Sequence, residues 1–122
     1  MPNPFVHVEL ATSDVAKAKD FYGNLFGWKL EDVPMGPGGY TLIGVGDDGV
    51  GGGIMKNPMP GAPSHWMAYV QVDDLAAATA KAKALGATVV VDVTSVGEMG
   101  AFTIIQDPSG ATLGLWHSDR GA

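Results

Sequence analysis

The sequence of 122 residues contains no cysteine. Disulfides, thiolate metal ligands and a cysteine nucleophile are therefore excluded. A cytoplasmic location is the expected default for a chain without disulfides. Two further motifs are absent: the glycine-rich phosphate-binding loop that ends in Gly-Lys-Ser/Thr, and the Gly-x-Ser-x-Gly turn that would carry a serine nucleophile.

Basic residues are also scarce. Seven lysines and arginines stand against thirteen acidic residues, which gives a formal net charge of −6. This balance argues against a nucleic-acid backbone or an anionic membrane as the partner. No apolar run approaches the roughly 18 residues of a membrane span, and the start of the sequence lacks the basic and apolar segments of a signal peptide.

The sequence does contain an internal repeat. Residues 8–19 and 68–79 both read as an alternating strand, an acidic turn and an alanine-rich helix, with Asp14 and Asp74 at an offset of 74 − 14 = 60 residues. A repeat of this kind predicts two similar modules. We expect one domain with module one at 5–57, a proline-rich linker at 58–64 and module two at 65–118.

Hydrophobic alternation and turn residues predict the order strand–helix–strand–strand–strand in each module. Ser13 or Asp14 should cap the first helix, and Asp73 or Asp74 the second. In the second helix Leu75, Ala78, Ala82 and Leu85 are expected to share one face. Strands are expected over 5–12, 28–33, 40–45, 50–56, 66–72, 89–93, 101–106 and 111–117.

Three motifs resemble the vicinal oxygen chelate superfamily, also called the glyoxalase/bleomycin resistance/dioxygenase family. The first is Asp14-Val15, Ala18, Phe21-Tyr22 and Leu25-Phe26-Gly27-Trp28; the second runs from Val72-Asp73-Asp74-Leu75 to Leu85-Gly86-Ala87; the third is Asp107-Pro108-Ser109-Gly110. The resemblance implies an α+β fold in which two tandem βαβββ modules form a curved, cup-like mixed sheet with helices on the outer face. It also implies a small-molecule ligand and a homodimer. Because aromatic residues often fill junctions, we expect Trp28 and Trp66 to be packing residues near the seams.

Metal-dependent members of this superfamily hold a divalent ion with four ligands. The resemblance places the first-strand ligands at His7 and Met67 and the last carboxylate at Gly114. No Asp or Glu occurs between Gly49 and Val72, or between Pro108 and Ser118. A methionine thioether is a poor ligand for such ions. We therefore expect no metal cofactor, with His7 and His65 as weak candidate ligands if an ion is bound.

Alternation along the strands places the candidate ligand-binding residues on one face. They are His7, Glu9, Met67, Tyr69, Gln71 and Trp116. Glu9 is also the candidate catalytic base. Two interpretations stay open: these residues contact a ligand, or they are solvated and packing residues. Trp116 in particular could form one wall of the cavity or fill it.

The sequence thus favours a glyoxalase-like protein that binds a small organic molecule in a concave pocket without the usual divalent metal. One alternative is a lyase or dioxygenase of the same superfamily, either at a reduced metal site or by metal-free acid–base chemistry at Glu9. Another is a non-catalytic structural partner domain. The sequence does not decide whether the protein is an enzyme.

Overall fold

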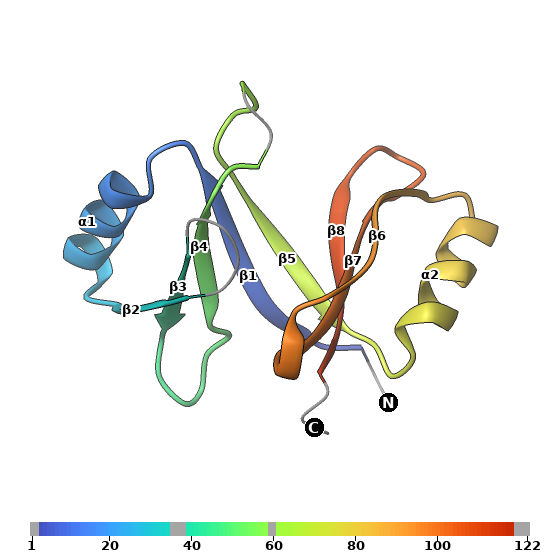
Figure 1. Cartoon of the computed structure of the whole chain (residues 1–122), viewed down its shortest axis with the longest axis horizontal. Helices are drawn as coiled ribbons and strands as arrows, with labels where there is room; N and C mark the ends of the chain where they lie inside the picture. Colours follow the sequence, from blue (N-terminus) through green and yellow to red (C-terminus); the bar gives the residue numbers. More distant parts are fainter. Residues whose placement is uncertain (1–2, 35–38, 59–60, 119–122) are drawn as a thin grey trace. The chain divides into compact units, whose positions relative to one another are not determined.

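A computed structural model describes residues 3–34, 39–58 and 61–118 (Figure 1). The order strand–helix–strand–strand–strand occurs twice, which confirms the predicted α+β class and the tandem βαβββ pattern. The elements are β1 (Phe5–Thr12), α1 (Val15–Phe26), β2 (Lys29–Val33), β3 (Tyr40–Gly44), β4 (Gly52–Lys56), β5 (His65–Gln71), α2 (Leu75–Ala84), β6 (Thr88–Ser95), the single-turn helix η1 (Gly97–Met99), β7 (Gly100–Gln106) and β8 (Thr112–Ser118).

The chain divides into two compact units, and the first comprises His7–Met67. Its strands follow in the order β2-β3-β4-β1, with β1 parallel to β4 and the other pairs antiparallel. Helix α1 packs on one face of these strands (Figure 1), over a core of Leu10, Ile43 and Ile54. Ile54 is completely buried.

The second unit comprises Met1–Val6 and Ala68–Ala122. Its strands follow in the order β5-β8-β7-β6, again with one parallel pair, β5 and β8. Helix α2 packs against β6, β7 and β8 over a core of Val72, Leu75, Ile105 and Leu115. The N-terminal segment joins this unit, because the Gln71 amide donates to the Pro4 carbonyl at 2.9 Å.

Both helices begin where the sequence predicts. The carboxylates of Asp14 and Asp74 accept the amides of Lys17 and Ala77 at 2.9 and 3.0 Å, which satisfies donors left free at each helix N-terminus. Helix α1 ends at Gly27, whose φ of 70° lies in the left-handed region that suits glycine. No helix in the described ranges is long and apolar enough to cross a bilayer.

The structure corrects several details. Leu85 is not on the packed face of α2: it is the C-terminal cap residue and 70% exposed. Strand β4 begins at Gly52 instead of Val50, and β6 extends to Ser95. Part of the predicted turn after β2 and of the proline-rich linker lies outside the described residues.

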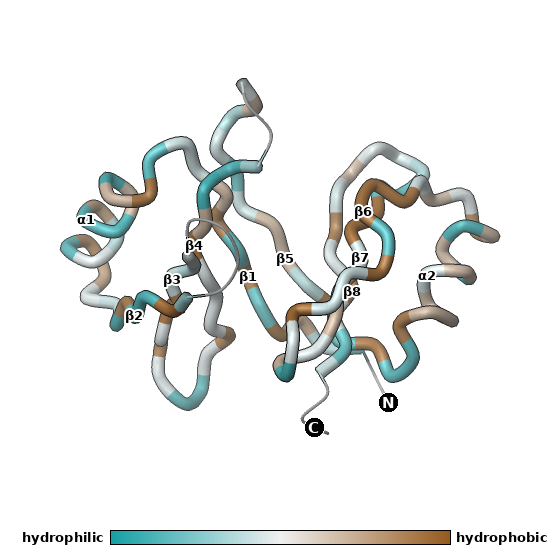
Figure 2. Tube along the Cα trace, in the orientation of Figure 1, coloured by the Kyte–Doolittle hydropathy of each residue, from teal (hydrophilic) through white to brown (hydrophobic). Residues whose placement is uncertain are grey.

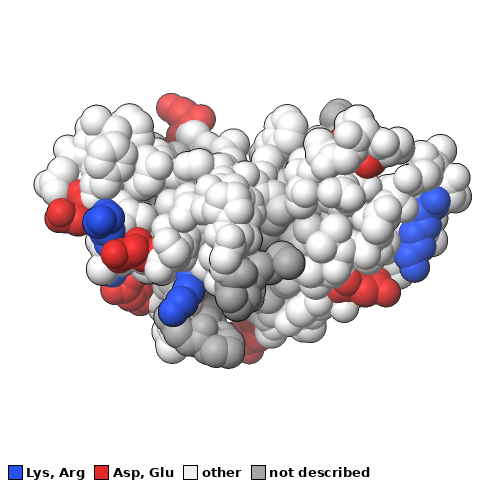
Figure 3. Space-filling view, turned by 90° about the horizontal axis from the view of Figure 1, so that it is seen from above, with Lys and Arg blue, Asp and Glu red and all other residues white. Residues whose placement is uncertain are grey.

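Strand β6 is the last strand in the second unit's order and a largely hydrophobic one (Figure 2). Its Val90, Val91 and Val93 are exposed. The pairing of β6 with β7 shifts register twice, and Asp92 interrupts the valines. Irregular pairing and a charge are both features that discourage further strand addition at a sheet edge. The molecular face in Figure 3 is mostly uncharged, with a few acidic and basic side chains on it.

Candidate functional site

Three polar side chains of the first unit form a continuous hydrogen-bond chain. The hydroxyl of Tyr40 donates to Oε2 of Glu9 at 2.8 Å and lies 2.8 Å from Nε2 of His7. The hydroxyl has only one hydrogen, so Nε2 of His7 must carry the proton and donate to the Tyr40 oxygen. All three residues are half-buried. The arrangement fixes one imidazole tautomer next to a carboxylate.

The strand order explains how Tyr40 reaches Glu9. Tyr40 begins β3, Glu9 lies in β1, and β4 runs between these strands. At the crossing point β4 carries Gly53, which is in register with Glu9. Any side chain at Gly53 would collide with the Tyr40 ring. The glycine therefore allows the phenol to lie across β4.

The second unit repeats this pairing of a glycine with a tyrosine ring. Tyr69, the counterpart of Glu9 at an offset of 60, is in register with Gly114 of β8. A side chain at Gly114 would collide with the Tyr69 ring. That ring is 6% exposed and packs edge-on against Phe102 with 6.3 Å between ring centroids. Tyr69 thus covers the β8 position where the superfamily resemblance implies a carboxylate.

The other predicted residues fall on these strands as alternation requires. Gln71 and Trp116 are paired in register two residues beyond Tyr69 and Gly114, and so on the same face, and both are half-buried. Met67 lies in β5 and is half-buried. These residues lie on the strands that the sequence predicts for them; their role as one ligand-binding set stays a prediction.

The two candidate histidines differ in environment. Burial disfavours the charged imidazolium and lowers the pKa of His7 below its ordinary value of 6.5. His65 begins β5, is exposed, and its Nδ1 lies 3.0 Å from the carbonyl oxygen of Pro63. Across 3–34, 39–58 and 61–118, no group of three or more His, Cys, Asp and Glu side chains is placed to hold a metal ion.

The sequence model of the Glyoxalase/Bleomycin resistance protein/Dioxygenase superfamily matches residues 5–115. The chain belongs to this superfamily. Membership confirms the resemblance that the motifs around Asp14, Asp74 and Asp107 indicated. The superfamily signature therefore covers both units, including every predicted site residue except Trp116.

Two proteins of similar sequence come from bacteria. CFP32 of Mycobacterium tuberculosis, named as a candidate glyoxylase, is 37% identical over 120 residues, which cover 93% of this chain and 45% of the relative. DnrV of Streptomyces peucetius, named an anthracycline biosynthesis protein, is 29% identical over 123 residues, which cover 88% of this chain and 44% of the relative. The chain spans less than half the length of either relative.

Among solved structures, methylmalonyl-CoA epimerase from Mycobacterium tuberculosis has a TM-score of 0.70 at 16% sequence identity. The match covers 93% of this chain and 87% of the epimerase. At this identity the likeness concerns the fold alone.

Tyr40 is the residue of this superfamily member that sequence reasoning missed. The local pattern predicts a strand at Tyr40 and no role for its side chain. The available signal was indirect: Gly53 interrupts a short strand, and a strand glycine often marks a place where another group approaches closely. The identity of the approaching group depends on strand order, which the local sequence pattern does not contain.

Proposed function

We propose that this chain binds a small organic molecule at the sheet face that carries His7, Tyr40 and Glu9, without the divalent ion used by metal-dependent relatives. The observation that carries the proposal is the Tyr40 hydroxyl held at 2.8 Å from both Glu9 and His7. The cavity of about 280 Å³ that Tyr40 helps to line lies on the side of α1, with Val15, Lys19 and Ile54 in its lining, and is separate from the face proposed here.

The residues present do not fit the ion that the resemblance implies. An octahedral site needs several hard oxygen donors. Gly114, where the resemblance implies the last carboxylate, supplies none, and the Tyr69 ring covers the position where a side chain would begin. Strand β4 of the first unit contains no carboxylate either. The imidazole of His7 is engaged by a phenol instead of a carboxylate. This arrangement supports recognition by hydrogen bonds, with no step through a metal.

The names of the relatives are compatible with a small organic ligand. One concerns anthracycline biosynthesis and another methylmalonyl-CoA. A pocket that combines a few converging polar groups with apolar walls is typical of small-molecule sites. The ligand groups best suited here are a hydroxyl or carbonyl oxygen that can exchange hydrogen bonds with the Tyr40 hydroxyl.

A second candidate function is metal-free acid–base chemistry in an isomerase-like or lyase-like reaction. The hydrogen bond between Tyr40 and Glu9 favours it, because a phenol next to a carboxylate can pass a proton to and from a bound substrate. Glu9 would be the base and Tyr40 the group that relays the proton. A homodimer and a cytoplasmic location also remain proposals.

A thermal-shift screen of small organic compounds tests the proposed function. A ligand at 100 times its dissociation constant adds about 2.7 kcal/mol to the free energy of unfolding. We expect a stabilising compound whose effect is lost in Tyr40→Phe, kept in the matched control Tyr22→Phe, and unchanged by a chelator. A screen without a stabilising compound contradicts the proposal, as does a compound that stabilises Tyr40→Phe as much as it stabilises the wild type.

A further inference from the structure

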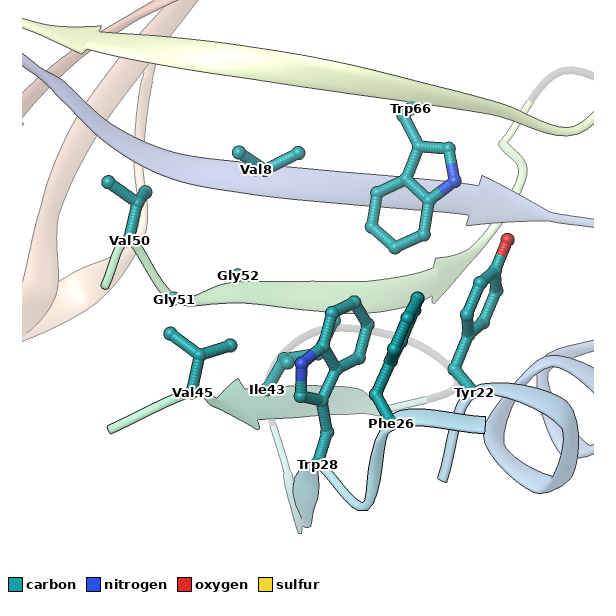
Figure 4. Close-up of a pocket in the computed structure, with 10 residues that line it drawn as sticks. All are labelled: Val8, Tyr22, Phe26, Trp28, Ile43, Val45, Val50, Gly51, Gly52 and Trp66. Carbon is teal, nitrogen blue, oxygen red and sulfur yellow. The ribbon is translucent and has the colours of Figure 1, made fainter. Parts of the chain in front are cut away.

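The first unit contains a second cavity, on the other face of its strands from the Tyr40 hydrogen-bond chain. Its volume is about 460 Å³, and all its lining residues lie between His7 and Met67. Figure 4 shows them: Val8, Tyr22, Phe26, Trp28, Ile43, Val45, Val50, Gly51, Gly52 and Trp66. None belongs to the ligand-binding set proposed above. We call this space the aromatic cavity.

Three strands form its floor. Val8, Gly52 and Ile43 are in register across β1, β4 and β3, and Ile43 also belongs to the core that α1 covers. A side chain at Gly52 would collide with the Val8 carbonyl, and one at Gly51 would approach the Ile43 carbonyl to 2.9 Å. Two successive glycines therefore keep the middle of the floor bare, beyond the C-terminal end of the helix.

Aromatic rings form the walls. Tyr22 stacks on Trp28 at a centroid distance of 5.8 Å, Phe26 lies 4.8 Å from Trp28, and Trp66 meets Trp28 edge-on at 6.4 Å. These are the separations at which aromatic pairs attract each other. The rings hold one another in place, while Phe26 and Trp66 remain 56% and 39% exposed. Figure 4 shows Phe26, Trp28 and Trp66 gathered around the open space.

The chemistry of the lining defines the guest. No lining residue carries a charge, and the polar side-chain groups are two indole N–H donors and one phenol. The volume lies within the range of small-molecule pockets. A charged molecule would lose its hydration without gaining an ion pair, and an anion would also meet a chain of net charge −6. A neutral molecule with aromatic rings would find ring faces and edges to contact.

We propose that the aromatic cavity is a second binding site, which takes a neutral, ring-bearing small molecule. The guest lies on the Gly51–Gly52 floor and packs against Phe26, Trp28 and Trp66. The site is independent of Tyr40, because β1, β3 and β4 separate the two faces. A second copy of the chain is the rival occupant of this apolar surface, and the experiment distinguishes the two.

Two dyes with the same rings provide the test. Phenylnaphthylamine is neutral, and anilinonaphthalenesulfonate adds a sulfonate; both fluoresce more strongly in apolar surroundings. Each is titrated into the wild-type chain, Trp66→Ala, Phe26→Ala and Trp66→Phe. Leu85→Ala is the matched control, since it truncates an exposed apolar side chain in the other unit. Far-UV circular dichroism and urea midpoints establish that each variant is folded.

The expected result is one neutral dye bound per chain, with the sulfonated dye about tenfold weaker. Trp66→Ala and Phe26→Ala should each weaken neutral-dye binding by about tenfold, in line with loss of a ring contact and its buried area. Tyr40→Phe and Leu85→Ala should bind as the wild type does, and Trp66→Phe, which keeps an aromatic ring, should bind more tightly than Trp66→Ala. Unchanged binding in both alanine variants overturns the proposal. So does sedimentation that shows a dimer dissociated by the neutral dye, since the cavity is then an interface between copies.

Discussion

The substitution Tyr40→Phe removes one oxygen atom and with it two hydrogen bonds of 2.8 Å. The bond to the Glu9 carboxylate is worth about 1.5–3 kcal/mol and the bond to His7 about 0.5–1.5 kcal/mol. Both partners are half-buried, so water replaces part of what is lost. We expect the free energy of unfolding to fall by roughly 2 kcal/mol.

Urea denaturation measures this loss. With an m-value of about 1.5 kcal/mol/M, the midpoint should fall by about 1.3 M while the slope stays unchanged. Tyr22→Phe is the matched control in the same unit, because its ring packs on Trp28 while its hydroxyl has no hydrogen-bond partner in the part of the chain that the structure describes. A Tyr40→Phe midpoint equal to that of the control would refute the account of this hydroxyl.

Three further predictions concern the same unit. Burial lowers the pKa of His7 below 6.5, so the unfolded chain binds this proton at a higher pH than the folded chain does, and the free energy of unfolding should fall as the pH drops from above 6.5 toward the lower folded pKa. The variant His7→Gln should flatten this pH profile, whereas the exposed His65→Gln should leave it as in the wild type. Identical pH profiles of the wild type and His7→Gln would contradict the role given to His7. Gly53→Ala should lower the free energy of unfolding by about 1–3 kcal/mol, because the new methyl group would overlap the Tyr40 ring. Gly44→Ala should lower it less in the same urea assay, because its new carbon would lie 3.6 Å from Cβ of Lys29. Ile54→Ala should cost about 2–5 kcal/mol, because this side chain is completely buried, and a loss under about 1 kcal/mol by calorimetry would count against the core described here.

Local features of the fold were predictable from the sequence. Asp14 and Asp74 precede apolar, alanine-rich segments, and the capping hydrogen bonds that they form require only residues three positions away. Strand alternation placed His7 and Glu9 on one face, and the shared hydrogen-bond chain through Tyr40 confirms it. Such features depend on short-range geometry, which a single sequence carries.

Features that depend on strand order were not predictable. Tyr40 reaches Glu9 only because β4 separates their strands and carries Gly53 at the crossing. Trp28 and Trp66 pack on neighbouring rings as predicted, but they also wall a cavity whose floor is bare because of two glycines in another strand. Long-range register of this kind is set by the whole fold and not by the local pattern.

The side chain of Leu85 shows a different limit. Helical periodicity placed it in line with Leu75, which is buried. The helix ends one residue earlier, so the periodicity no longer applies at Leu85. Sequence periodicity locates a helix terminus only to within one or two residues. Here a difference of one residue decides whether Leu85 is packed or 70% exposed.

The metal content of protein purified without chelators is the measurement that tests the central claim most directly. The claim is that this chain holds no divalent ion, because the Tyr69 ring covers Gly114, the position where the superfamily resemblance implies the last carboxylate. Mass spectrometry of the purified chain for nickel, zinc, manganese and iron should find far less than one ion per chain, with no difference between the wild type and His7→Ala. An ion present at nearly one per chain and lost in His7→Ala would contradict the account.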